Sequence, residues 1–146
     1  MTSNFYIVFG ADFIAGFPTE DNKAHLQSMK LINEAGITYI HVFPYSDREG
    51  TAATKMPKVL KEDIKKRSKE LRLLGQKQCK NYLSTQIGTT QNVLTEKNGK
   101  GYTPNFSKIL FNEDVNPGLI ISAEIISANS INLIGKPIKI NEVVKF

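Results

Sequence analysis

Two strand-like hydrophobic patterns follow one another along the first part of the 146-residue chain. Residues 5–17, FYIVFGADFIAGF, are almost continuously apolar, which favours a parallel strand covered on both faces. Residues 37–43, ITYIHVF, form the second run. Between the runs, apolar residues recur at helical spacing and predict the buried stripe of an amphipathic helix, made of Leu26, Met29, Ile32 and Ala35. This order predicts one right-handed βαβ unit that belongs to a larger sheet.

Local signals mark the ends of the predicted helix. Thr19 is a candidate N-cap, with Glu20 and Asp21 in the first turn near the positive end of the helix dipole. Gly36 is a candidate C-cap. The helix is therefore bounded on both sides.

The loops after the two strands form the expected functional edge. In parallel α/β folds, the loops that follow strand C-termini lie on one face. Residues 16–20 (GFPTE) and 44–51 (PYSDREGT) should therefore share a rim. Asp12 lies inside the first apolar run, where we expect a buried, hydrogen-bonded carboxylate or one that points into a barrel or at a neighbouring strand.

From residue 86 onward the pattern changes to short β-rich runs. Five such runs lie between residues 86 and 136, separated by NG, NED, NPG and AN turn signals. They predict a small closed barrel related to OB-folds, which often bind single-stranded or looped RNA. Basic and aromatic residues gather near one predicted hairpin: Lys97, Lys100, Tyr102, Asn105 and Phe106. Ordinary turn polarity with core aromatics would give the same pattern.

The net charge of +5 comes from one segment. Residues 58–80 hold nine Lys/Arg against three Asp/Glu, whereas residues 1–57 carry −2 and residues 81–146 carry +1. Helical spacing of apolar residues predicts an amphipathic helix over about 58–83, with its stripe at Leu60, Ile64, Leu71, Leu74 and Cys79. One side of it carries Lys61, Lys65, Lys69 and Arg72. This side is either a solvated face or a surface for nucleic-acid phosphates.

The single cysteine, Cys79, limits the chemistry of the chain. It excludes an intrachain disulfide and any metal or iron–sulfur site built from several cysteines of this chain. It fits a reducing, cytoplasmic environment. No apolar run is long enough to span a bilayer, and no basic segment precedes the first apolar run, so we expect neither a membrane contact nor a signal peptide. A thiolate pair of Cys79 with His25 or His41 is the least favoured function.

Several motifs together resemble one enzyme family. The stretches GADFIAGFPTE (10–20) and EAGITYIHVFPYSDREGT (34–51), the basic helix and the LIGK run (133–136) resemble the C-terminal part of the radical S-adenosylmethionine (SAM) tRNA methylthiotransferases. The chain is most similar to the subgroup that acts on N6-threonylcarbamoyladenosine at tRNA position 37. The resemblance implies a βαβ piece of a partial (β/α) radical SAM barrel at residues 1–75, including the basic helix. A five-stranded TRAM (OB-like) β-barrel would follow at residues 76–141.

The resemblance also implies site residues. Ile14 and Gly16 would lie on the strand beside S-adenosyl-L-methionine, and Ser46 and Arg48 on the next rim loop. The resemblance makes tRNA, at the anticodon stem-loop, the expected ligand of the basic and aromatic residues already selected by charge and spacing: Lys61, Lys65, Lys69, Arg72, Lys97, Lys100 and Tyr102. Departures from the family pattern include Asp47 and Ala52, where prolines usually stand, which loosens the rim loop.

The family uses [4Fe–4S] clusters held by a CxxxCxxC motif and further cysteines, and this chain lacks them. We therefore expect no cofactor held by this chain alone, no catalytic residue and no metal ligand. Three hypotheses stay open. The chain is the tRNA-binding portion of a methylthiotransferase that needs a separate chain carrying the cluster-binding domains. Alternatively, it is a stand-alone RNA-binding module, or a non-functional remnant of a split gene.

Overall fold

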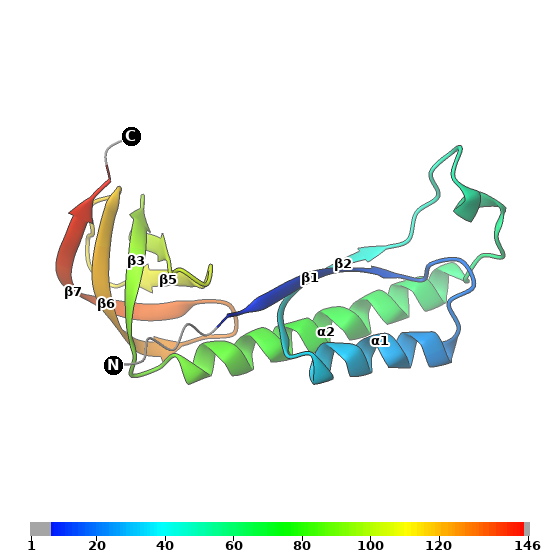
Figure 1. Cartoon of the computed structure of the whole chain (residues 1–146), viewed down its shortest axis with the longest axis horizontal. Helices are drawn as coiled ribbons and strands as arrows, with labels where there is room; N and C mark the ends of the chain where they lie inside the picture. Colours follow the sequence, from blue (N-terminus) through cyan, green and yellow to red (C-terminus); the bar gives the residue numbers. More distant parts are fainter. Residues whose placement is uncertain (1–6, 145–146) are drawn as a thin grey trace. The chain divides into compact units, whose positions relative to one another are not determined.

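A computed structural model describes residues 7–144 (Figure 1). These residues form two compact units that meet between Gln78 and Cys79. The boundary lies inside the long helix α2 (Lys61–Thr85). Each unit has its own hydrophobic core.

The first unit is a βαβ unit followed by the first turns of α2. Strand β1 (Phe9–Ala15), helix α1 (Asn22–Glu34) and strand β2 (Ile37–Pro44) lead to a short 3₁₀ helix, η1 (Ala52–Lys55). The two strands pair in parallel, which confirms the predicted topology. The part of the first predicted strand before residue 7 lies outside the described residues.

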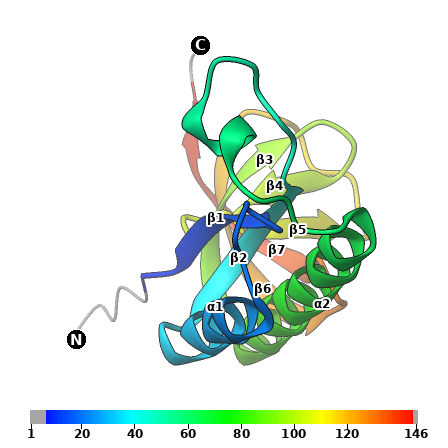
Figure 2. The same ribbon diagram turned by 90° about the vertical axis from the view of Figure 1, so that its right-hand side faces the viewer.

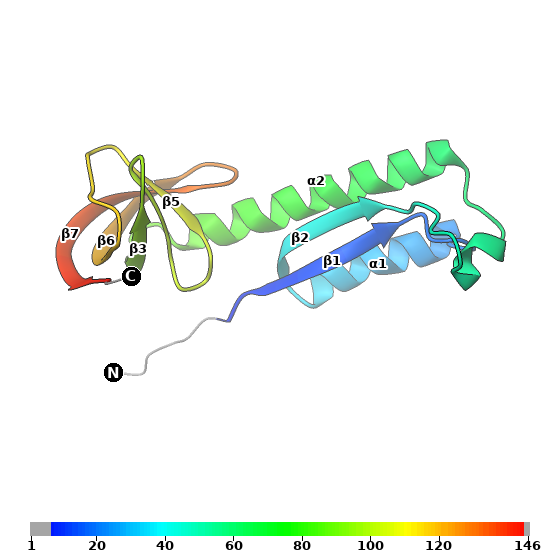
Figure 3. The same ribbon diagram turned by 90° about the horizontal axis from the view of Figure 1, so that it is seen from above.

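Both helices cover the same side of this two-stranded sheet. Figures 1 and 2 show α1 and the first turns of α2 side by side, and Figure 3 shows β1 and β2 lying over them. The core between sheet and helices is built on Ala15, Ile32, Ile37 and Leu71. On the opposite face Ile14 and Phe43 are 56% and 54% exposed. The expectation that the first strand is covered on both faces is therefore wrong within this chain, because the sheet has helices on one side only.

The N-terminus of α1 differs from its prediction. Asp21, not Thr19, is the N-cap, and its Oδ1 accepts a hydrogen bond from the Ala24 amide at 2.7 Å. Thr19 has a φ of 72° and donates its amide to Pro57 O at 3.1 Å, so the chain is still turning there. At the other end, Gly36 follows the C-cap with a φ of 62°, as expected of a helix-ending glycine.

The buried stripe of α1 is only partly as predicted. Ile32 is fully buried and Met29 packs against the core, but Leu26 and Ala35 are exposed. His25 takes the buried place beside Leu26 because α1 faces α2 as well as the sheet, and His25 Nε2 lies 2.7 Å from Glu70 Oε2 of α2.

Helix α2 begins three residues later than predicted. Leu60 precedes it and is exposed, whereas Ile64 and Leu74 are partly buried and Leu71 is buried. Gly75 lets the helix pack closely on the sheet, because a Cβ there would lie 3.1 Å from Ile40 Cβ.

The second unit is a closed five-stranded barrel, as the strand pattern predicted. Its strands are β3 (Thr90–Glu96), β4 (Lys100–Tyr102), β5 (Lys108–Phe111), β6 (Leu119–Ala128) and β7 (Leu133–Val143), in the order β3-β4-β5-β7-β6. Pairing is antiparallel except between β5 and β7. Leu83 of α2 enters the core, which otherwise consists of Val93, Ile109, Phe111, Ile121, Ala123, Ile125 and Leu133.

Candidate functional site

The two loops after β1 and β2 meet at one rim, as their parallel pairing predicted. The Tyr45 amide donates to Ala15 O at 2.8 Å, which fixes the start of the second loop against the end of β1. The rings of Phe17 and Tyr45 meet edge to face, with centroids 5.5 Å apart and planes at 79°. This rim is therefore a built surface with aromatic contacts between its loops.

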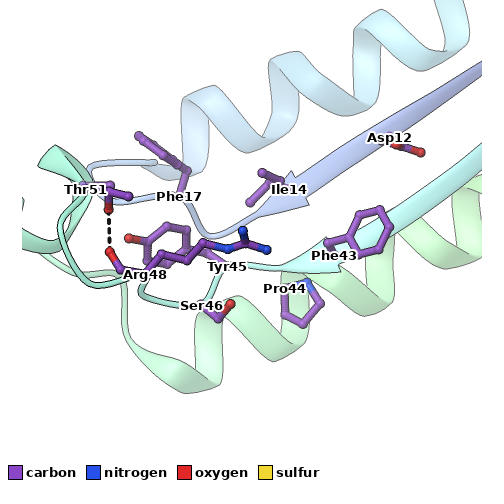
Figure 4. Close-up of a pocket in the computed structure, with 10 residues that line it drawn as sticks. Asp12, Ile14, Phe17, Phe43, Pro44, Tyr45, Ser46, Arg48 and Thr51 are labelled. Atoms are coloured by element: carbon purple, nitrogen blue, oxygen red, sulfur yellow. Dashed lines mark hydrogen bonds between the residues drawn. The ribbon is translucent and has the colours of Figure 1, made fainter.

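A pocket with a volume of about 610 Å³ opens at this rim (Figure 4). We call it the rim pocket. Its lining is mostly apolar, with a few polar groups: Asp12, Ile14, Phe17, Phe43, Pro44, Tyr45, Ser46, Arg48, Thr51 and Ala53. Three of the four residues expected to lie near SAM, namely Ile14, Ser46 and Arg48, are in this lining. An apolar pocket with few polar groups is a typical small-molecule site.

Gly16, the fourth of those residues, has a different place. It is not among the residues that line the rim pocket. Its φ is 76°, and a Cβ there would lie 2.4 Å from Ile64 Cγ1 of α2. Glycine is thus needed at this position for the turn and for close packing of α2.

A buried ion pair holds the first rim loop against α2. The Arg67 guanidinium donates to Glu20 Oε1 at 2.9 Å, to Glu20 O at 2.8 Å and to Asn22 Oδ1 at 3.0 Å. Glu20 Oε2 in turn accepts from the Gly16 amide at 3.0 Å. The side chains of Arg67 and Glu20 are only 8% and 13% exposed. This network positions the loop that carries Phe17.

Lys58 holds the second rim loop. Its ammonium group donates to Asp47 and, at 3.0 Å, to Ala53 O, and it lies 5.5 Å from the centre of the Tyr45 ring. Tyr45 also donates its hydroxyl to Asp47 at 3.0 Å. The bonds from Lys58 and then Tyr45 lower the pKa of Asp47. The pKa of Tyr45 is raised, mainly because its hydroxyl is desolvated and secondly because it donates a hydrogen bond to Asp47.

Asp12 does not lie where its sequence context suggested. It is exposed on the uncovered face of β1 and lines the rim pocket. The expectation of a buried carboxylate is wrong, because the helices cover only the other face of this sheet.

The exposed side of α2 carries a cationic face, which we define as Lys61, Lys65, Lys69 and Arg72. All four side chains are exposed. Arg72 also donates to Val42 O at 3.1 Å, which ties its guanidinium to the end of β2. Two other basic residues of the same segment form ion pairs within the chain: Lys58, which precedes α2, with Asp47, and Arg67 of α2 with Glu20. Helix α2 therefore uses Arg67 in its packing and leaves the cationic face exposed.

The predicted RNA-contacting residues of the barrel lie on its outer side. Lys97 is exposed, Lys100 is half-buried and Tyr102 is 36% exposed. Tyr102 stands opposite Leu94 of β3 and Lys108 of β5 in the strand register. The alternative of core aromatics is wrong for Tyr102 and for Phe106, because both side chains are exposed; the aromatic residues at the barrel core are Phe111 and the partly buried Tyr82.

Cys79 and His25, two other residues considered for catalysis, take part in packing and hydrogen bonding within the fold. Cys79 packs against the barrel core, and burial raises the pKa of its thiol. His25 is bonded to Glu70 of α2. Among residues 7–144, no group of three or more His, Cys, Asp or Glu side chains could hold a metal ion. No helix in the same range is long and apolar enough to cross a membrane.

The buried Arg67–Glu20 pair was not predicted from the sequence. A signal for it exists: Arg67 lies on the apolar stripe of α2, between Ile64 and Leu71. A charged side chain on a buried stripe requires an opposite charge nearby. The sequence alone does not say which acidic residue provides it.

No protein-family model matches the chain. Threonylcarbamoyladenosine tRNA methylthiotransferase MtaB of Rickettsia prowazekii is 42% identical over 120 residues, which cover 82% of this chain and 28% of that protein. The protein of the same name from Aquifex aeolicus is 35% identical over 101 residues, or 68% of this chain and 25% of that protein. The tRNA-2-methylthio-N(6)-dimethylallyladenosine synthase of Bartonella bacilliformis is 31% identical over 137 residues, or 89% and 30%. The chain spans 25–30% of the length of these curated relatives.

Proposed function

The chain belongs to the tRNA methylthiotransferase family, and we propose that it is the tRNA-binding, C-terminal portion of such an enzyme. The relatives that are 42% and 35% identical to this chain favour a threonylcarbamoyladenosine tRNA methylthiotransferase. In this proposal the first unit is the end of a partial radical SAM barrel. The second unit is a TRAM domain.

The observation that carries the proposal is the cationic face of α2. Its four side chains are exposed and follow the i, i+4 and i, i+3 spacing that aligns them along one side of a helix. Clustered Lys and Arg bind nucleic acid largely by releasing counterions from its phosphates. The anticodon stem-loop of tRNA is the proposed ligand. Lys97, Lys100 and Tyr102 of the barrel are proposed to add contacts to it.

The family's two cofactor types fit this chain differently. A [4Fe–4S] cluster needs several cysteine thiolates, and the chain has only Cys79, which packs against the barrel core. We therefore derive no radical step from this chain. S-adenosyl-L-methionine fits the rim pocket better, with Ile14 as apolar contact, Ser46 as a hydrogen-bonding group and Arg48 as partner for a carboxylate.

A separate chain carrying the cluster-binding domains is the proposed partner. The exposed face of β1 and β2, with Ile14 and Phe43, supports this, because parallel sheets are normally covered on both faces. The outer edges of the two-stranded sheet support it as well, since no strand within residues 7–144 pairs with them and unpaired edges favour strand addition. The relatives are more than three times as long as the part of them that aligns with this chain, which covers 28% and 30% of their length.

Binding of tRNA by the full chain tests the proposal. The informative variant is K61A/K65A/K69A/R72A, and the matched control is K23A/K30A/K136A/K139A, which removes the same charge from other exposed positions. We expect the first variant to bind tRNA at least tenfold more weakly than the control. Equal affinities would contradict a specific role for the cationic face.

The same experiment separates the alternatives. Tight binding without any cysteine-bearing partner in the cell would favour a stand-alone RNA-binding module. Absence of binding by the folded chain would favour a non-functional remnant. Recovery of a partner chain together with tRNA would favour the split enzyme.

A further inference from the structure

Phe106, on the surface of the second unit, has an exposed side chain and an unfavourable backbone conformation. Its side chain is 81% exposed, and its φ is 59°, in the left-handed region. Left-handed backbone is unfavourable for residues other than Gly, Asn and Asp, and most of all for bulky ones. An exposed phenyl ring also gains little from folding. Phe106 therefore combines two unfavourable features at one position.

The turn around Phe106 is firmly built. The Phe106 amide donates to Thr103 O at 2.9 Å, and the Thr103 amide donates to Ser107 O at 3.0 Å. Ser107 donates its amide to the Thr103 hydroxyl at 3.2 Å, and both side chains are buried. Asn105 Nδ2 donates to the Tyr82 hydroxyl at 3.1 Å, which anchors the turn to α2 within the same unit. The exposed ring thus stands on a rigid base.

Another turn of the barrel has a residue type that is common at a left-handed position. Asn98, in the β3–β4 turn, has a φ of 65°, close to that of Phe106. Asparagine tolerates this conformation, and the following Gly99 suits a tight hairpin. The β4–β5 turn instead keeps a large aromatic at its left-handed position. Such an outlier points to a functional reason for the side chain.

The surroundings of Phe106 suit a nucleic acid better than a protein. Residues 97–112 contain Lys97, Lys100 and Lys108 and no acidic residue. Lys108 pairs with Tyr102 in the register next to the turn. Of the other turn residues, Thr103 and Ser107 are buried and Asn105 is polar, so the exposed apolar side chains of the turn are Phe106 and the small Pro104. That is far less than a protein interface needs, but it is enough to stack one base.

We propose that Phe106 is a stacking platform for an unpaired base of bound RNA, and that Lys108, two residues further along the chain, contacts the backbone phosphates. This inference rests on the proposed function and deepens it, because it assigns the barrel a preference for looped over fully paired RNA. Every base has an aromatic face, so stacking on Phe106 requires an unpaired nucleotide but no particular sequence.

The chain contains no tryptophan, so F106W places a single fluorescent reporter at this position. We expect an RNA hairpin of the anticodon-arm type to quench and shift its emission on binding. The same stem prepared as a blunt duplex should leave the emission unchanged. Emission that does not respond to the bound hairpin would overturn the inference.

A second variant, F106G, separates stacking from folding. Glycine relieves the left-handed backbone, so the midpoint of thermal unfolding should stay the same or rise. Affinity for the hairpin should fall about tenfold, and affinity for the duplex should not change. N98G is the matched control, because it changes a left-handed turn residue of the same barrel without removing an aromatic ring, and it should keep hairpin affinity.

The outcomes distinguish this inference from the proposal beneath it. If the wild-type chain binds the hairpin and F106G binds it equally well, stacking is wrong and RNA binding stands. If wild-type protein binds neither RNA, both are wrong. A loss of thermal stability in F106G with unchanged hairpin affinity would assign Phe106 a structural role instead.

Discussion

Arg67 and Glu20 form a buried ion pair, with Nη1 and Oε1 2.9 Å apart, that joins the first rim loop to the second turn of α2. The same Glu20 carboxylate accepts a hydrogen bond from the Gly16 amide. One acidic residue of the loop thus orders the turn at the end of β1 and fixes it to the helix that carries the cationic face.

The Arg67–Glu20 pair should be important for stability. R67M removes one partner and leaves a nearly buried carboxylate without its counter-charge, which typically costs about 3–5 kcal/mol of unfolding free energy. Urea unfolding of the full chain measures this. The control is K30M, which breaks the exposed Lys30–Glu34 pair, whose side chains are 71% and 63% exposed, and should cost less than about 1 kcal/mol. Similar losses in the two variants would contradict this account.

Gly16 should not tolerate a side chain. In G16A the new Cβ meets Ile64 at 2.4 Å and the backbone keeps a φ of 76°. Gly50 has a φ of 82° but no atom within 4 Å of its would-be Cβ, so G50A measures the backbone effect alone, about 1 kcal/mol. Thermal unfolding should show a clearly larger loss for G16A, and I64A, which removes the clashing Cγ1, should cost less stability in G16A than in wild type. A G16A variant as stable as G50A would mean that α2 packs less closely.

Asp47 should contribute to stability at neutral pH but not in acid. Its pKa in the folded chain lies below the ordinary value of 3.8, because it accepts bonds from Lys58 and Tyr45. A lowered folded pKa means that the charged form is favoured by folding. This contribution is present above 3.8 and is lost as pH falls through the folded pKa. Thermal midpoints of wild type and D47N should therefore differ at pH 7 and converge below pH 3.8. A constant difference would contradict the assignment.

Cys79 should react slowly as a nucleophile. Burial raises the pKa of its thiol above the ordinary 9.0, so little thiolate exists at neutral pH. Alkylation by iodoacetamide at pH 7.5 should be slower than that of a free thiol such as glutathione, and the difference should disappear in denaturant. Fast alkylation of the native chain would reopen the hypothesis of a cysteine nucleophile.

The helices and strands could be predicted from the sequence because they depend on the local pattern of apolar and turn-forming residues. The period of the apolar residues and the turn signals after residue 86 predict the βαβ unit and the closed barrel, and both are observed. The parallel pairing expected of a βαβ unit also predicted that residues 16–20 and 44–51 share a rim, where Phe17 and Tyr45 are in contact.

Features that depend on distant partners were not accessible in the same way. Asp12 was expected to be buried because a continuous apolar run normally lies inside a sheet, yet within residues 7–144 this sheet has two strands and one covered face. The capping role passes from Thr19 to Asp21 because Thr19 is bonded to the Pro57 carbonyl. The exposure of Asp12 and the position of the N-cap both depend on contacts between residues far apart in sequence, which local propensity cannot predict.

The salt dependence of tRNA binding tests the central claim most directly. The logarithm of the association constant of the full chain should fall steeply with the logarithm of salt concentration. K61A/K65A/K69A/R72A should show a slope smaller by about 3, as expected when four phosphate contacts are lost. The K23A/K30A/K136A/K139A control should keep the wild-type slope. Equal slopes for the two variants, or a wild-type affinity that does not depend on salt, would contradict a phosphate-binding role for the cationic face.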